Sequence, residues 1–331
     1  MTNRSATSTL FGFDFQTNAA IVLMLENIKD LSTIRLEGYE DIEIGLSNDS
    51  YVLAQAKAIV NSSTDFANVL RNLNNSIKSL SDAGKSCPCV KQFIYITNSP
   101  NPFNEKQRNS IFWGTAQREY NSLPQELKKK ITEIVAKVSN PIDVEKFKIQ
   151  ILPFETNNDR ERYKCVMDSI REFLATTPAP YLAQQLHLIW KDELFKTGTR
   201  NGQEIKLTKD DIIWPLIVLI TKNDNYDDEN LDDSEVEEIN RLYNDIINTC
   251  SEKYEFVTKV LYAYNYFQKD ENKRKRVRNF IEQKYLDFSF IFEGMDVSIE
   301  NGSKELLLKI ILRNILNKRI QIEQIKRAVN L

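Results

Sequence analysis

The sequence predicts an α/β unit, with a mixed central sheet flanked by helices, over residues 1–176 and an all-α unit over residues 177–331. Three observations predict this division. Strand-like runs alternate with helix-like segments in the first half, and nearly all periodic segments in the second half have helical spacing. The stretch 176–180, which is rich in Thr and Pro, separates the two halves. A chain of 331 residues also suits about two domains.

The elements of the first half follow from the periodicity of their apolar residues. The run at 92–97 is continuously apolar, as expected of a strand that is buried on both faces of a sheet. In chain order we expect a helix at 16–28, strands at 34–46 and 51–58, a helix at 65–80, a loop at 81–89, a strand at 92–97, helices at 104–121 and 124–138, a strand at 148–152 and a helix at 159–175.

The second half is expected to contain helices at 181–195, 208–222, 234–249, 251–268, 271–286 and 303–329. A content of 41% hydrophobic and 27% charged residues is typical of a globular protein. No apolar run approaches the roughly 20 residues needed to cross a bilayer, and the start of the chain lacks a signal-peptide core. We therefore expect a cytoplasmic protein without a membrane segment.

Several classes of enzyme are disfavoured by composition. The four Cys residues do not have zinc-site spacing, and the single histidine, His187, lies among apolar residues of an expected helix. Catalysis by histidine is therefore not expected. The sequence has nine Gly residues and contains neither of the Gly-rich phosphate-binding motifs, GxGxxG and GxxxxGK(S/T).

Residues 34–57 contain the most specific pattern. Asp41 begins a short apolar run, and Gln55 and Lys57 end the next one. Because alternate residues of a strand share a face, Gln55 and Lys57 should project together. If the two runs form a hairpin, these side chains and Asp41 converge at one edge of a small sheet.

That set of side chains suits a divalent cation and a phosphodiester. Mg²⁺ is usually held by one or two carboxylates together with waters and phosphate oxygens. We expect Asp41 to be the central ligand and Glu37 a second acid nearby. The Gln55 carbonyl would bind the metal or orient its water, and Lys57 would stabilise charge on the phosphorane. The alternative is an ordinary amphipathic hairpin with solvated charges.

The chain resembles the PD-(D/E)xK nucleases in the order helix, acidic residues, strand and Gln-x-Lys. The segment Gly12-Phe13-Asp14-Phe15-Gln16, followed by an apolar helix, Glu37, Asp41 and Gln55-Ala56-Lys57, more closely resembles the effector endonuclease domain of bacterial anti-phage systems. Such domains occur in CBASS effectors and in the nuclease subunit of Lamassu complexes. The resemblance covers roughly the first half.

This resemblance implies a restriction-endonuclease-like fold and cleavage of double-stranded DNA with Mg²⁺ or Mn²⁺. Asp41, Gln55 and Lys57 would occupy the catalytic positions, with Glu37 and Gln16 as helpers. This chain departs from the pattern in having no Pro before Asp41 and a neutral Gln55, so weak metal affinity without DNA is expected. A non-catalytic adaptor that keeps the nuclease fold for binding DNA or protein is the alternative.

Two basic clusters are candidate DNA contacts, although both also suit solvated helix faces. A net charge of −3 and a pI of about 5.6 disfavour strong DNA binding by one copy of the chain. We therefore expect self-association or partners, and the likeness to Lamassu subunits implies an SMC-like ATPase and a small accessory subunit. The clusters are Lys128, Lys129 and Lys130 in the first half and Lys273, Arg274, Lys275 and Arg276 in the second.

Overall fold

The computed structural model describes residues 6–62, 64–106, 110–200, 205–222, 233–248, 252–267, 273–292 and 301–331. Contacts within the chain divide it into two compact units. The first contains residues 1–175 and 183–209, and the second contains 176–182 and 210–329. Composition predicted one change of unit near residue 176, whereas the structure assigns Ala183–Lys209 to the first unit.

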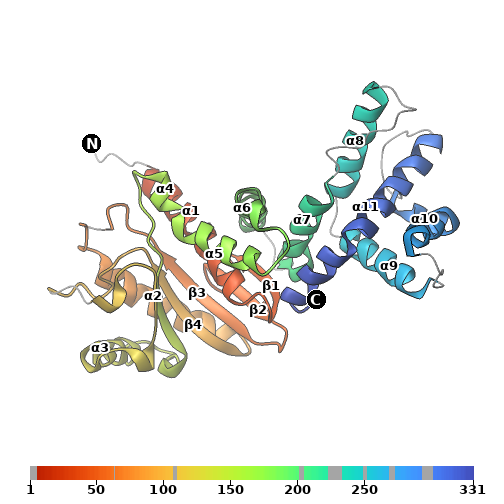
Figure 1. Cartoon of the computed structure of the whole chain (residues 1–331). Helices are drawn as coiled ribbons and strands as arrows, with labels where there is room; N and C mark the ends of the chain where they lie inside the picture. The colour runs from red at the N-terminus through yellow and green to blue at the C-terminus, as the bar shows by residue number, and fades with distance from the viewer. Residues whose placement is uncertain are drawn as a thin grey trace. The chain divides into compact units, whose positions relative to one another are not determined.

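The first unit is built around a mixed seven-stranded sheet in the order β5-β6-β4-β3-β2-β1-β7 (Figure 1). Neighbouring strands are antiparallel except for β3–β4 and β4–β6, which are parallel. The mixed sheet predicted for this half is thus present. The strands are β1 (Leu31–Leu36), β2 (Ile42–Leu46), β3 (Tyr51–Lys57), β4 (Val90–Thr97), β5 (Ala116–Glu119), β6 (Phe147–Ile151) and β7 (Leu207–Thr208).

Helices cover both faces of this sheet. On one face lie α1 (Thr7–Glu26), α5 (Lys164–Ala175) and α6 (Ala183–Gly198), and on the other lie α2 (Val69–Ser86) and α3 (Gln125–Val135) (Figure 1). The short α4 (Asp159–Arg162) precedes α5. All residues of α1 from Phe15 to Met24 are buried, because the sheet covers one side of the helix and α5 and α6 pack on others.

Alternation along β3 assigns its side chains to these two layers. Leu53 belongs to the apolar core that also contains Leu73 and Ile77 of α2. Because alternate residues share a face, Gln55 and Lys57 lie on the α2 side of the sheet. The candidate polar residues therefore continue a row that begins in the core and ends at the carboxyl end of β3.

Three predicted elements of the first half are wrong in detail. The described residues within 104–121 do not form the predicted α-helix. They contain the short 3₁₀ turns η1 (Ser110–Phe112) and η2 (Tyr120–Ser122), with the edge strand β5 between them. The run 34–46 lies in a hairpin of two strands, and residues 81–86 of the predicted loop at 81–89 belong to the end of α2. Strand β5 exists because it pairs with β6, a contact that its own residues do not reveal.

The second unit is helical, as predicted. Tyr243 is fully buried and donates a hydrogen bond to the backbone oxygen of Thr221 at 2.6 Å. Helix α11 packs against α8, α9 and α10 and against η5 (Tyr285–Phe292). No helix within the described ranges is both long and apolar enough to span a bilayer. The helices are α7 (Lys209–Thr221), α8 (Asp233–Asn248), α9 (Glu252–Tyr266), α10 (Lys273–Lys284) and α11 (Asn301–Ala328).

Candidate active site

The site begins at the turn between β1 and β2. Glu37 takes a positive φ of 54°, and its backbone N–H donates to the Asp41 oxygen at 3.1 Å. Gly38 follows, and a Cβ there would stand 2.3 Å from a Glu43 carboxylate oxygen. Only glycine fits without displacing Glu43, whose carboxylate accepts the Tyr39 N–H at 3.0 Å. The turn therefore holds Glu37 and Asp41 in fixed positions.

Asp41 is held at the ends of two strands. Its Oδ2 atom accepts the backbone N–H of Ala56 at 2.9 Å and the side-chain amide of Gln55. The Lys57 ammonium lies 3.5 Å from the same oxygen. No hydrogen bond within the described part of the chain ends on Oδ1 of Asp41. One carboxylate oxygen is thus anchored, and the other is available to a ligand.

Helix α1 supplies a further polar contact to this site. Gln16 donates its amide both to the Glu37 carboxylate and to the backbone oxygen of Asp41, each at 2.8 Å. The structure therefore brings together all five residues predicted for the site, Gln16, Glu37, Asp41, Gln55 and Lys57. The side chains of Lys57 and Asp41 remain 35% and 20% exposed, so a substrate can reach them.

Sequence reasoning overlooked Glu40, which lies beside this set. Its side chain is buried, one oxygen accepts the Asp41 N–H at 3.1 Å, and the other has no hydrogen-bond partner among the described residues. Burial raises the pKa of Glu40 to about 7, and the neighbouring Asp41 charge contributes. Nothing in the sequence distinguishes Glu40 from the other acids of its run.

The donors present fit a magnesium ion that is completed by substrate. No group of three His, Cys, Asp or Glu side chains in the described ranges is arranged to bind a metal by itself. The available oxygens are those of Asp41 and Glu37, and the carbonyl of Gln55, whose amide nitrogen points at Asp41. Because Mg²⁺ commonly uses one or two carboxylates plus water and phosphate, this set suffices only when phosphate is bound.

Hydrogen bonds join the loops that follow the parallel strands at this edge. The Thr97 hydroxyl donates to the backbone oxygen of Lys57 at 2.7 Å. Asn98 is buried, and its amide donates to the oxygens of Ile59 and Phe154 at 2.8 and 2.9 Å. Its own oxygen accepts the Ile59 N–H at 2.8 Å. Asn98 therefore links the segments of chain that follow β3, β4 and β6, next to the candidate site.

The predicted DNA contacts differ in their surroundings. Lys129 is exposed on α3, Lys128 lies 5.7 Å from the Tyr120 ring centre, and Lys130 forms an ion pair with Glu105. Arg276 is partly buried and donates to backbone oxygens at the end of α9, so it stabilises that helix end. Lys275 is exposed. Lys273 and Arg274 begin α10, but their side chains lie outside the described residues.

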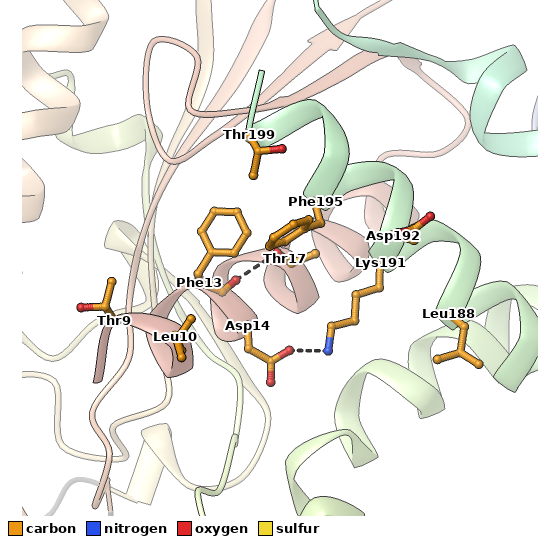
Figure 2. A pocket seen from close by; sticks show the side chains of 10 residues that line it. All are labelled: Thr9, Leu10, Phe13, Asp14, Thr17, Leu188, Lys191, Asp192, Phe195 and Thr199. Carbon is orange, nitrogen blue, oxygen red and sulfur yellow. Dashed lines mark hydrogen bonds and ion pairs between the residues drawn. The ribbon is translucent and has the colours of Figure 1, made fainter. Parts of the chain in front are cut away.

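A separate hollow of about 690 Å³ lies between α1 and α6 (Figure 2). Figure 2 shows the Asp14 carboxylate meeting the Lys191 ammonium, which is 2.6 Å away. Rings of Phe13 and Phe195 pack edge to face beside this pair, and Leu10 is 68% exposed at the rim. Because its opposite charges are paired, the hollow offers mainly apolar contact.

His187 is buried next to this ion pair. Its Nε2 lies 2.8 Å from the Asn18 oxygen, and the Asn18 amide donates to Asp14. Burial, together with the smaller effect of the Lys191 charge, lowers the pKa of His187 to about 4, against the opposing effect of Asp14. His187 is therefore a neutral, hydrogen-bonded core residue.

We predict that His187 makes stability depend on pH. An unfolded histidine has a pKa near 6.5, so between pH 6.5 and 4 the unfolded chain binds more protons than the folded one. The free energy of unfolding should fall as pH decreases through this window, by up to about 3 kcal/mol. Urea denaturation of wild type and His187→Gln at pH 7 and 4.5 measures this, and the variant should lose less stability. An equal loss in both proteins would contradict the prediction.

Comparison with known proteins adds no relative. No protein-family model, no curated protein and no solved structure matches this chain.

Proposed function

We propose that this protein is a metal-dependent endonuclease of double-stranded DNA with a restriction-endonuclease-like first unit. The observation that supports this most strongly is the position of Asp41, Gln55 and Lys57 around one carboxylate oxygen at the ends of β2 and β3. An amphipathic hairpin with solvated charges does not require these three side chains to meet. The sheet order, with β3 parallel to β4 behind the site, supports the same reading.

Each residue of the site has a distinct role in the proposed reaction. Asp41 and Glu37 supply negative oxygens, and Gln55 holds Asp41 while presenting its carbonyl. Lys57, partly exposed, would donate to the phosphate oxygen on which charge develops during attack by water. Gln16 keeps Glu37 and the turn in place. A bound Mg²⁺ or Mn²⁺ would polarise the phosphate and lower the pKa of attacking water.

We further propose that partner proteins, an SMC-like ATPase and a small accessory subunit, hold the nuclease inactive. After release from these partners, several copies of the chain would assemble into the active form. Two observations support a need for assembly. The net charge of −3 opposes DNA binding by one copy, and Lys130 is already paired with Glu105. The second unit also exposes apolar side chains suited to protein contacts, including Tyr262, Leu286 and Ile320.

Plasmid cleavage by the purified chain tests this function. We expect nicking and linearisation with Mg²⁺ or Mn²⁺, no cleavage in EDTA, and DNA binding without efficient cleavage in Ca²⁺, which is larger and less demanding in geometry. The rate should rise more steeply than linearly with protein concentration if copies assemble. Full activity in EDTA would refute the metal mechanism. DNA binding without cleavage under every condition would favour the adaptor alternative.

A further inference from the structure

Trp113 is a large aromatic side chain that is mostly exposed. Its exposed fraction is 63%, whereas the other two tryptophans of the chain, Trp190 and Trp214, are 1% and 6% exposed. Exposed tryptophan is uncommon, because burying its ring removes a large apolar area from water. The exposure of Trp113 therefore indicates a role other than packing in the core.

The turn that carries Trp113 is fixed rather than loose. The backbone N–H of Trp113 donates to Ser110 at 3.1 Å, and the next residue, Gly114, has a φ of 67° that favours glycine. The preceding Phe112 is 1% exposed, and its ring centre lies 5.9 Å from that of Phe103. The Phe112 ring is thus anchored in the core, whereas the ring of the next residue, Trp113, points outward.

The loop that follows β4 contacts the candidate active site and, through Phe103 and Phe112, the turn that carries Trp113. The Thr97 hydroxyl bonds the Lys57 backbone oxygen, and two residues of the following loop, Asn101 and Glu105, exchange hydrogen bonds at 3.0 Å. Glu105 also pairs with Lys130 of α3. The turn before Trp113 is therefore attached to the loop that follows β4, and the exposed Lys106 lies on the same segment.

The topology places Trp113 at the edge of the sheet where the site lies. Lys57 pairs with Thr97, and Ala116, which follows Trp113 by three residues, pairs with Ile151. Lys57, Thr97 and Ile151 are all at the carboxyl ends of their strands. Crossing from β3 through β4 and β6 to β5 spans three strand spacings, or about 14 Å. DNA rises about 3.4 Å per base pair, so this separation corresponds to about four base pairs.

We propose that Trp113 contacts the bases of a DNA duplex bound across this end of the sheet, inserting its ring against a base step several base pairs from the scissile phosphate. Apolar side chains that wedge into a duplex in this way unstack a step and fix the position of the DNA. Lys106 is exposed on the segment that precedes this turn and would bind a neighbouring phosphate. This inference rests on the proposed nuclease function and assigns to Trp113 the positioning of its substrate.

Tryptophan fluorescence tests the contact directly, because Trp113 is the exposed member of the three tryptophans. A short DNA duplex is titrated into the Lys57→Ala protein in Ca²⁺, so that binding is observed without cleavage. We expect the duplex to change the emission and to protect it from acrylamide quenching. The same titration with Lys57→Ala/Trp113→Phe should lose this response.

Affinity measurements separate the ring from general effects of substitution. Trp113→Ala should weaken duplex binding about tenfold, the scale of one lost base contact, and Trp113→Phe should weaken it less. Tyr181→Ala, which removes an aromatic ring that is 77% exposed elsewhere, should leave affinity unchanged.

Two results would overturn the inference: acrylamide quenching of Trp113 that is unchanged by bound duplex, or no duplex binding at all. If wild type cleaves DNA but Trp113 stays unprotected, this inference fails and the nuclease proposal stands. If Trp113 is protected but wild type never cleaves, the nuclease proposal fails and the DNA contact stands.

Discussion

Lys57→Ala and Asp41→Asn should each reduce the rate of DNA cleavage by about 10²–10³-fold. This is the usual cost of losing one group that stabilises charge in the transition state. The Lys57 ammonium is the only cation recorded within ion-pair distance of Asp41 among the described residues. Asn at position 41 removes the negative charge but keeps an oxygen that can accept the Ala56 N–H. Both variants should therefore lose activity with little loss of stability.

Matched control residues lie at the strand ends on the opposite side of the same sheet from the candidate site. Lys91 is exposed at the start of β4, and Asp30 is exposed just before β1. Lys91→Ala and Asp30→Asn make the same chemical changes away from the site and should cleave plasmid DNA at the wild-type rate. Initial rates in Mg²⁺ and urea unfolding curves are measured for all four variants. Wild-type cleavage by folded Lys57→Ala or Asp41→Asn would refute the assigned roles.

Asn98→Ala should lower the free energy of unfolding by about 3–5 kcal/mol, because it leaves three buried backbone groups without their partners. These groups are the N–H and oxygen of Ile59 and the oxygen of Phe154. A loss of this size is a large fraction of the 5–15 kcal/mol that is usual for a protein domain. Urea or thermal denaturation followed by circular dichroism measures it.

The control for this variant is Asn75→Ala, which makes the same change at an exposed position of α2. It should change stability by less than about 0.5 kcal/mol, as surface substitutions generally do. If Asn98→Ala were equally mild, the three loops after β3, β4 and β6 would not depend on Asn98 for their attachment.

Local patterns in the sequence were sufficient for most of the fold. The apolar run at 92–97 and the helical spacing at 65–80 both predicted elements close to β4 and α2. The predicted helix at 104–121 is wrong because β5 is a strand of four residues, Ala-Gln-Arg-Glu, at the edge of the sheet. Such a strand has no apolar alternation of its own and is defined by pairing with a distant partner.

The convergence of Asp41, Gln55 and Lys57 was predicted from the sequence, but the contacts of Gln16 and the burial of Glu40 were not. Spacing placed Gln55 and Lys57 on one face, which the structure reproduces around Asp41. The bond from Gln16 to Glu37 depends on how α1 crosses the β1–β2 turn, and no local pattern contains that information. Glu40 was overlooked for the same reason, since its burial comes from the packing of the sheet against α2 and not from its neighbours in sequence.

The chain order of the two units has a consequence for dissecting the molecule. Residues 176–182 belong to the helical unit, 183–209 return to the sheet unit, and the chain then leaves it again. A fragment ending at residue 176 would lack α6, which packs on α1, α5 and β1, and β7, which covers the edge of β1. Because the two units alternate along the chain, a single truncation of the gene at residue 176 does not separate them. A fragment that contains the whole sheet unit must extend to Lys209.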